Sequence, residues 1–355
     1  MTHFSAFDHA MVRRALALAE RGLWTTSPNP RVGCVFTQGE RVVGEGWHER
    51  AGEPHAEVIA LRAAAGEAKG ATAYLSLEPC NHHGRTPPCT DALIAAGVAR
   101  VVAAMRDPNP QAAHGGAKLQ AAGIRFEHGL MEDEARELNL GFVSRVTRGR
   151  PWVRMKVAAT LDGRTALANG KSQWITGPEA RQDGHRWRAR ACATLTGIGT
   201  VLADDPRMTV REVETTRQPL RAVVDSKLEI PARARILEGG NVLLFCAKQG
   251  AAPKGTEAVC MANADGKVDL PAMLAELARR GVNELHVEGG FKLNGSLLRE
   301  GCVDELLVYL NPSLLGDSAL GMANLAEATG LDQRIALKLV SVDRVGGDIR
   351  IIART

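Results

Sequence analysis

Four residues in the first third of the chain have the types and spacing of a zinc site. His55 and Glu57 form an H-x-E triplet, and Cys80 and Cys89 each follow a proline. One imidazole and two thiolates fill three positions of a tetrahedral zinc site and leave the fourth for water, whereas a structural site is closed by a fourth protein ligand. We therefore expect His55, Cys80 and Cys89 to hold one Zn2+ per chain. A purely structural zinc is the alternative.

Glu57 favours the catalytic interpretation. A carboxylate two residues from a ligand can take the proton from zinc-bound water and return it to a leaving amine, which is the role of the non-ligand Glu in zinc deaminases. Residues 81–88 separate the two cysteines, whereas only two residues do so in the common deaminase signature. From the residues alone, either this segment is an inserted loop or Cys89 is not a ligand.

Alternating strand and helix patterns position these residues at one edge of a predicted sheet. A first helix is expected over 8–22, and apolar runs at 32–36 and 41–47 flank a Gln-Gly-Glu turn that predicts a hairpin. His55 and Cys89 each open a helical pattern, and a strand pattern carries Cys80. Helix N-termini favour a thiolate over a thiol, and α/β folds gather their sites at such an edge.

Composition limits the classes of partner. The chain has 355 residues, enough for two domains, with a formal net charge of +4 and only 4% aromatic residues. Proteins that track nucleic acid usually carry a concentrated basic face or stacking aromatics, so we expect no nucleic-acid partner. The dispersed cysteines indicate a reducing compartment. No signal peptide or membrane span is recognisable, which predicts a cytoplasmic protein without a membrane partner.

The second half predicts a mostly parallel, doubly wound sheet. Strand patterns near 153–160, 220–226, 241–247, 284–290 and 305–312 are joined in part by helical patterns at 178–191 and 270–281. Gly289 and Gly290 stand between a strand and a helix, where a phosphate can reach backbone N–H groups. Taken alone, two glycines also fit an ordinary turn, and they do not make a GxGxxG fingerprint. The arginines of the 178–191 helix form either a solvated face or, in part, a phosphate site.

Several motifs together resemble one family. HAE at 55–57, EPCNHHGRTPPC at 78–89 and DPNP at 107–110 resemble the deaminase half of the bifunctional riboflavin-biosynthesis deaminase–reductases. LDGR at 161–164, SQWIT at 172–176, VLADDP at 201–206 and VEGG at 287–290 resemble its reductase half. The resemblance covers nearly the whole chain. In that family a long gap between the cysteines is the rule, which implies that the intervening loop contacts substrate.

The resemblance implies an α/β protein with two catalytic domains. Residues 1–147 would form a cytidine-deaminase-like α/β/α domain, and residues 148–355 a dihydrofolate-reductase-like α/β domain. The implied reactions are hydrolytic deamination of 2,5-diamino-6-(5-phosphoribosylamino)pyrimidin-4-one and then NADPH reduction of its ribosyl side chain to ribityl. The partners would be small phosphorylated pyrimidines and further copies of the chain, as a dimer or tetramer. Two alternatives are a nucleoside or tRNA-base deaminase with a non-catalytic C-terminal domain, and a zinc-stabilised binding module.

The family also implies roles for individual residues. The deaminase substrate would contact Asn29, His48, His82, Arg85, Asp107 and Asn109, although the residues alone leave His48 equally open to a structural role. NADPH would contact Ala158, Trp174, Thr200, Asp204, Ser226, Gly290, Phe291, Lys292, Leu293, Asn294, Gly295 and Ser296. The reductase substrate would contact Ser172, Arg188, Arg207, Arg211 and Glu288.

Overall fold

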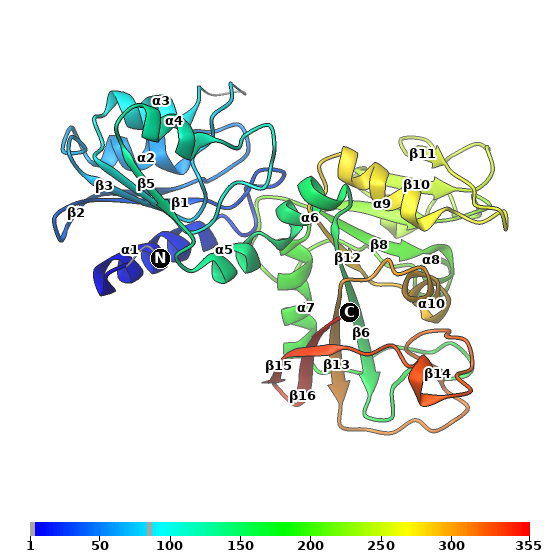
Figure 1. Cartoon of the computed structure of the whole chain (residues 1–355). Helices are drawn as coiled ribbons and strands as arrows, with labels where there is room; N and C mark the ends of the chain where they lie inside the picture. Colours follow the sequence, from blue (N-terminus) through cyan, green and yellow to red (C-terminus); the bar gives the residue numbers. More distant parts are fainter. Residues whose placement is uncertain (1–3, 84–86) are drawn as a thin grey trace. The chain divides into compact units, whose positions relative to one another are not determined.

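The computed structural model describes residues 4–83 and 87–355, and these form two compact units (Figure 1). The units are Met1–Gly149 and Arg150–Thr355, so their boundary lies close to the expected one at 147/148. In the part of the chain that the structure describes, no helix has the length and apolar character needed to cross a membrane.

The first unit is a five-stranded sheet in the order β2-β1-β3-β4-β5. Its elements are α1 (Ala6–Glu20), β1 (Gly33–Gln38), β2 (Arg41–Trp47), α2 (Ala56–Ala63), β3 (Thr72–Leu75), α3 (Cys89–Ala95), β4 (Arg100–Ala103), α4 (Gly115–Ala121), β5 (Arg125–His128), α5 (Glu132–Leu138) and α6 (Leu140–Arg148). The hairpin β1–β2 is antiparallel, as expected, and β3, β4 and β5 run parallel.

Both faces of this sheet are covered by helices. Because successive strand residues point to opposite faces, Cys34 and Phe36 pack in a cluster with residues of α2, α3 and α4, whereas Val35 packs in a second cluster with residues of α1 and α5. Figure 1 shows α2, α3 and α4 on one side of the sheet and α1 on the other. This confirms the α/β/α arrangement.

Two local details of the first unit were not predicted from the sequence. Strand β5 was not recognised, and the acidic run at 131–146 was expected as one helix. It divides at Asn139, whose side chain accepts a hydrogen bond from the backbone N–H of Arg31 at 2.8 Å and donates to its carbonyl at 3.0 Å. This distant partner decides the break, so no local pattern reveals it.

The second unit is built on a nine-stranded sheet in the order β11-β10-β9-β8-β12-β6-β13-β16-β15. Its elements are β6 (Trp152–Thr160), β7 (Arg164–Ala166), α7 (Pro178–Arg190), β8 (Ala193–Gly197), α8 (Ile198–Asp204), β9 (Leu220–Val224), η1 (Arg235–Leu237), β10 (Val242–Cys246), β11 (Glu257–Cys260), α9 (Leu270–Arg279), β12 (Glu284–Val287), α10 (Phe291–Arg299), β13 (Glu305–Asn311), β14 (Leu320–Gly321), η2 (Leu331–Gln333), β15 (Lys338–Val345) and β16 (Asp348–Arg354). Seven strands from β11 to β13 are parallel, and β16 and β15 are antiparallel additions.

The two ends of this sheet were not predicted from the sequence. Strands β11 and β15 are the edge strands, and most of their residues are exposed. An edge strand has few buried positions, so the apolar pattern by which the central strands were recognised is weak there. The parallel core of the expected sheet is confirmed, and its antiparallel extension by β15 and β16 is an addition to it.

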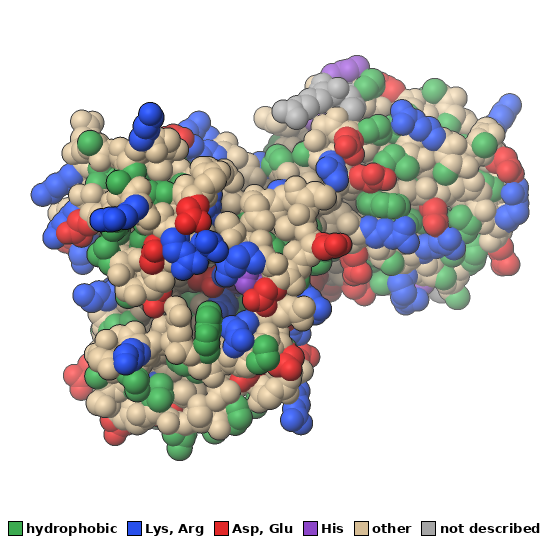
Figure 2. All heavy atoms as spheres, turned by 180° about the vertical axis from the view of Figure 1, so that it is seen from behind, with side chains coloured by type: hydrophobic (Ala, Val, Ile, Leu, Met, Phe, Trp, Pro, Cys, Tyr) green, Lys and Arg blue, Asp and Glu red, His purple; other side chains and the backbone are tan. Residues whose placement is uncertain are grey.

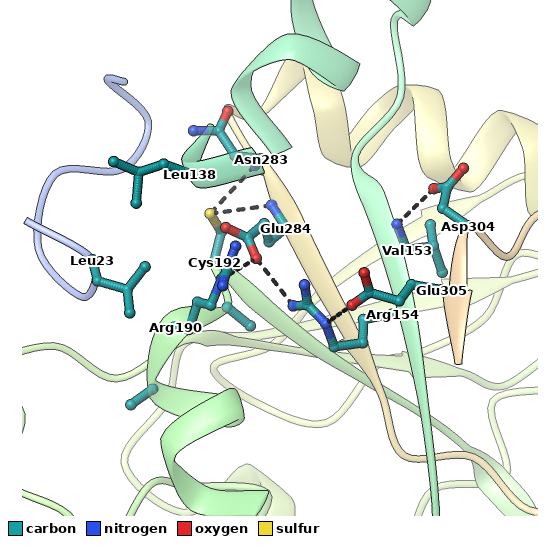
Figure 3. A network of polar contacts seen from close by, with 12 residues as sticks. Leu23, Leu138, Val153, Arg154, Arg190, Cys192, Asn283, Glu284, Asp304 and Glu305 are labelled. Atoms are coloured by element: carbon teal, nitrogen blue, oxygen red, sulfur yellow. Dashed lines mark hydrogen bonds and ion pairs between the residues drawn. The ribbon is translucent and has the colours of Figure 1, made fainter. Parts of the chain in front are cut away.

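A buried arginine joins three parallel strands of the second unit (Figure 3). Arg154 of β6 donates to Glu305 of β13 at 2.5 Å and to Glu284 of β12 at 3.0 Å, and all three side chains are at most 2% exposed. Arg190 also donates to Glu284, at 2.7 Å. Buried charges must be paired to avoid a large desolvation cost, so this network ties the strands into one register.

Charged side chains of both signs are intermixed on the face of the molecule shown in Figure 2. This distribution agrees with the small formal net charge of +4.

Candidate active sites

Three residues predicted as zinc ligands meet in the first unit. His55 stands at the N-cap of α2, Cys80 follows β3, and Cys89 begins α3. The Nδ1 atom of His55 lies 3.2 Å from Cys89 Sγ and 3.6 Å from Cys80 Sγ, and the three ligand atoms all lie within 4.8 Å of one another. No other group of three His, Cys, Asp or Glu side chains in residues 4–83 and 87–355 is placed to hold a metal.

The chemistry of this donor set fits a zinc ion. A hydrogen bond from Cys89 lowers the pKa of Cys80 to about 4; burial opposes this shift, and His55 adds to it. The neighbouring Cys80 thiolate and burial raise the pKa of Cys89 far above its usual range. Without a cation the pair therefore holds one thiolate, Cys80, and one thiol, Cys89, and a cation bound between them would allow both to ionise. Thiolate and imidazole are the ligands that zinc prefers.

Glu57 lies beside this cluster on the first turn of α2. Glu57 is only 3% exposed, and its Oε2 atom has no hydrogen-bond partner among the described residues. Burial and the nearby Cys80 raise the pKa of this carboxyl. A buried carboxylate with an unpartnered oxygen is unusual, and this oxygen is free to contact a molecule bound at the cluster.

A second carboxylate, missed from the sequence, supports the loop that carries Cys80. Glu78 is buried and accepts hydrogen bonds from the backbone N–H groups of Asp107 at 3.1 Å and Gly116 at 2.7 Å. A Cβ on Gly115 would lie 2.0 Å from the carbonyl oxygen of Pro79, so only glycine lets α4 approach this closely. The Glu directly before Pro79-Cys80 was the available sequence signal.

Asn29 and His48 are held as a pair. The Pro54 carbonyl can only accept a hydrogen bond, so Nδ1–H of His48 donates to it at 3.1 Å. In the neutral ring, Nε2 of His48 then accepts a hydrogen bond from Nδ2 of Asn29 at 3.0 Å. Burial lowers the pKa of His48, which favours this neutral form. The His48 and His55 rings meet edge to face with centroids 5.2 Å apart. His48 therefore lies next to the His55–Cys80–Cys89 cluster, and Asn29 is connected to that cluster through His48.

The remaining predicted substrate contacts of the deaminase half differ in how far they are buried. Asp107 is buried, which raises its carboxyl pKa to about 7, and it accepts from the backbone N–H of Asn109 at 2.8 Å. His82 is exposed, and Arg85 lies outside the described residues.

In the second unit, Arg188 and Glu288 form the centre of a polar cluster. Arg188 of α7 contacts Glu288 Oε1 at 2.8 Å through Nε and donates to the Thr209 carbonyl at 2.6 Å. Burial opposes ionisation of Glu288, but Arg188 overcomes it and lowers the pKa of this carboxyl well below its usual range. The arginine run on α7 is thus partly buried, because Arg188 faces the cluster while Arg186 is exposed.

Three residues of this cluster were missed from the sequence. Lys156 Nζ lies 4.0 Å from Glu288 Oε2, and burial lowers the pKa of this ammonium. His286 Nε2 lies 3.5 Å from Glu288 Oε1. His185 Nδ1 accepts from the backbone N–H of Arg211 at 3.2 Å. Each sits within a regular strand or helix pattern, where the sequence gives no reason to separate it from packing residues.

The two other predicted arginines are exposed. Arg207 donates to Glu238 at 3.1 Å, and the Arg211 guanidinium donates to the Thr209 carbonyl at 3.1 Å. Arg211 therefore shares the Thr209 carbonyl with Arg188, whereas Arg207 pairs with the exposed Glu238.

The glycine-rich turn at 289–290 lies against the start of α8. Gly290 is the N-cap of α10 and Gly197 the N-cap of α8, and neither helix has a side-chain cap. A Cβ on Gly290 would lie 3.3 Å from Thr200 Oγ1, and one on Gly197 would lie 3.4 Å from Leu293. Two adjacent helix N-termini capped by glycine present free backbone N–H groups, which suits the phosphates of a dinucleotide.

Other predicted cofactor residues lie on neighbouring elements. Asp204 accepts a hydrogen bond from Ser172 at 3.4 Å, and the exposed Trp174 ring is covered by the Arg181 guanidinium at 4.8 Å. The Ser226 carbonyl accepts from Ala247 N–H at 3.0 Å. The others are Ala158 in β6 and Phe291, Lys292, Asn294, Gly295 and Ser296 in α10.

Two family models match the chain. Residues 5–105 match the "Cytidine and deoxycytidylate deaminase zinc-binding region", and residues 151–351 match the "RibD C-terminal domain". Both halves of the predicted fold class are thereby confirmed.

Curated relatives and solved structures match over almost the whole length. The riboflavin biosynthesis protein RibD of Escherichia coli K12 is 48% identical, covering 96% of this chain and 98% of the relative. RibD of Haemophilus influenzae is 43% identical, covering 99% and 98%. The structure of Acinetobacter baumannii RibD (form 1) superposes with a TM-score of 0.92 at 42% identity, covering 98% of each chain.

A third similar structure is that of a protein named for both activities. The diaminohydroxyphosphoribosylaminopyrimidine deaminase/5-amino-6-(5-phosphoribosylamino)uracil reductase of Thermotoga maritima superposes with a TM-score of 0.89 at 33% identity, covering 98% of each chain. These matches span both units, so they do not favour a deaminase with a non-catalytic second domain. The chain belongs to the RibD family, the zinc- and NADPH-dependent bifunctional deaminase–reductases of riboflavin biosynthesis.

Proposed function

We propose that the two sites act in sequence on one phosphorylated pyrimidine, with the residue roles given below. The observation that carries the deaminase assignment is the buried Glu57 carboxylate, which has an unpartnered oxygen beside the His55–Cys80–Cys89 cluster. A purely structural zinc site, or a zinc-stabilised binding module, gives no reason to bury a carboxylate in this state.

In the deamination, His55, Cys80 and Cys89 would hold the zinc, which when bound would lower the pKa of a coordinated water toward neutrality. The role of Glu57 is to accept a proton from the attacking water and to deliver it to the leaving amine. Burial and the nearby Cys80 raise the pKa of Glu57, which makes its carboxylate a stronger base than an exposed one and supports the first of these steps. The products are the pyrimidinedione and ammonia.

Six residues are proposed to bind the deaminase substrate. The donor–acceptor chain from Asn29 through His48 to Pro54 fixes the direction of the Asn29 amide, which supports a role in orienting a ring. Asp107 is buried near Glu78 and Cys80, where either protonation state of its carboxyl is accessible at neutral pH. The complete set is Asn29, His48, His82, Arg85, Asp107 and Asn109.

In the reduction, NADPH supplies the hydride, and the protein binds and orients it. We propose that its phosphates lie at the glycine-capped N-termini of α8 and α10, with Thr200 between them. The proposed contacts are Ala158, Trp174, Thr200, Asp204, Ser226 and residues 290–296.

The second substrate is proposed to lie against the cluster around Glu288. Arg188 holds Glu288 ionised, so that carboxylate can accept hydrogen bonds from hydroxyl or amine groups of a substrate. Lys156, with its lowered pKa, is an ammonium that can give up a proton in this cluster. Ser172, Arg207 and Arg211 complete the proposed contacts, and the arginines suit a ribose phosphate.

One assay tests both activities. The zinc-loaded chain receives 2,5-diamino-6-(5-phosphoribosylamino)pyrimidin-4-one and NADPH, while ammonia release and the nicotinamide absorbance are followed together. We expect ammonia to appear first and NADPH to be consumed in equal amount afterwards. Ammonia without NADPH oxidation would contradict the reductase assignment, and NADPH oxidation without ammonia would contradict the order.

The protein is also proposed to work as a cytoplasmic homo-oligomer. All seven cysteines are free thiols, which suits a reducing compartment. The edge strand β15 exposes Leu339, Val340 and Val342, an apolar strip that a second copy would cover. Sedimentation analysis of the wild type and of Val342→Lys tests this, because the charged variant should shift a dimer or tetramer toward the monomer.

A further inference from the structure

Two cysteines outside both sites stand side by side at the edge of the second sheet. Cys246 ends β10 and Cys260 ends β11, and they are direct partners in the parallel register of these two strands. Adjacent strands lie about 4.8 Å apart, inside the range of about 4.4 to 6.8 Å that a disulfide allows between Cα atoms. Residues in register on neighbouring parallel strands project from the same face of the sheet, so the two side chains are neighbours, and besides burial a hydrogen bond with Cys260 contributes to the raised pKa of Cys246.

Their surroundings differ in a way that suits stepwise oxidation. Cys246 is only 1% exposed and its thiol donates to the Val259 carbonyl, whereas Cys260 is exposed on the outermost strand. Burial and the neighbouring Cys260 raise the pKa of Cys246 to about 11. An external oxidant therefore reaches the exposed Cys260 first. The raised pKa keeps Cys246 a thiol until Cys260 is in a mixed disulfide, and Cys246, held next to it, then loses its proton and attacks slowly.

We propose that Cys246 and Cys260 are a redox-active pair that closes reversibly to a disulfide and fixes the edge strand β11 to β10. Neither cysteine is a zinc ligand or a proposed substrate or cofactor contact. The pair is connected to one proposed cofactor contact, because Ala247, next to Cys246, donates to the Ser226 carbonyl.

The oxidant belongs to the class of small disulfides, of which glutathione disulfide is the cellular form. The Cys260 thiolate attacks one glutathione sulfur, forming a mixed disulfide and releasing one glutathione thiolate. The Cys246 thiolate then attacks the Cys260 sulfur and releases the second glutathione. The protein loses two electrons and two protons, and one glutathione disulfide becomes two glutathione molecules.

Tryptic mass spectrometry of the zinc-loaded full chain tests the pair directly. Cleavage after Lys and Arg leaves Cys246 on the peptide 236–248 and Cys260 on the peptide 255–267. After incubation with glutathione disulfide and alkylation of free thiols, we expect these peptides to appear linked, and dithiothreitol to separate them. Amide hydrogen exchange in β11 should slow in the oxidised protein, because the bridge opposes fraying of the edge strand.

Single variants separate the two roles. Cys246→Ser should trap glutathione on Cys260, Cys260→Ser should leave Cys246 as a free thiol, and the distant Cys302→Ser should still form the linked peptides. If the wild type carries glutathione on Cys260 without any linked peptide, or if Cys260 links to a different cysteine, the proposal is wrong. Because this test measures neither ammonia nor NADPH, its failure leaves the proposed function untouched.

Discussion

The Arg188 guanidinium contacts a single oxygen of Glu288, Oε1, through Nε at 2.8 Å and through Nη2 at 2.6 Å. The side chains are 10% and 18% exposed, so this ion pair is largely removed from water. It joins α7 to the end of β12. The pair therefore stabilises the second unit, and it keeps ionised the carboxylate that we propose contacts the reductase substrate.

Replacing Arg188 should affect stability and one activity. In Arg188→Leu the Glu288 charge stays buried without its main partner, which should reduce the free energy of unfolding by about 3 kcal/mol or more. NADPH oxidation should fall by about 100-fold or more, because the misplaced carboxylate no longer orients the substrate. Ammonia release should be unchanged. Chemical denaturation and the coupled assay measure these effects.

Arg186→Leu is the matched control for this variant. Arg186 lies on the same helix and is exposed, so its removal should change the free energy of unfolding by less than about 0.5 kcal/mol. Equal losses of NADPH oxidation in both variants would show that the helix, rather than the Arg188–Glu288 pair, is responsible.

His185 should make the second unit sensitive to acid. Burial and the charges of Arg188 and Arg211 lower its pKa to about 4 from 6.5. Between these two pH values the unfolded chain binds the proton and the folded chain does not, so the free energy of unfolding falls as the pH falls. The loss is at most about 3 kcal/mol. Hydrogen exchange of the β8 and β12 amides at pH 7 and pH 4.5 reports it for this unit.

The variant His185→Gln should flatten that dependence, since glutamine has no proton to gain in this range. His9→Gln, on the exposed face of α1, should leave the wild-type slope in place. If His185→Gln destabilises the unit equally at both pH values, the histidine acts through packing and not through its titration.

Glu57→Gln should separate metal binding from turnover. The amide keeps the shape of the side chain but neither accepts nor returns a proton, so we expect ammonia release to fall by about 100-fold to 10,000-fold. Zinc content, measured by atomic absorption, should stay at one per chain. NADPH oxidation should persist when the deaminated intermediate is supplied. Full ammonia release by this variant would remove Glu57 from the mechanism.

Cys89→Ala should lower zinc occupancy, because only His55 and Cys80 then remain as ligands. The deaminase activity should be lost with the metal, and a chelator should reproduce the loss in the wild type. Cys34→Ala is the comparison, since Cys34 is also buried in the first unit but lies outside the ligand cluster. Full zinc occupancy in Cys89→Ala would contradict the ligand set.

Residue types and spacing were enough to predict the chemistry of the first site and the order of the main elements. The zinc site could be predicted from one His, one Glu and two cysteines that follow prolines, because only a few side-chain types bind zinc. The central strands were recognisable because they are buried on both faces and form continuous apolar runs.

Features that are set by contacts between residues far apart in the sequence could be seen only in the tertiary structure. The break at Asn139 follows from its hydrogen bonds with Arg31, and the support of the Cys80 loop follows from Glu78 reaching Gly116. Lys156 lies in a strand pattern typical of packing residues, and only the parallel pairing of β6 with β12 places it beside Glu288. His286 precedes Glu288 by two residues and therefore shares its face of the sheet, but only the fold shows that this face is a polar cluster. The register of β10 and β11 likewise makes neighbours of Cys246 and Cys260. Such pairings depend on free-energy differences summed over the whole fold, which local sequence patterns do not contain.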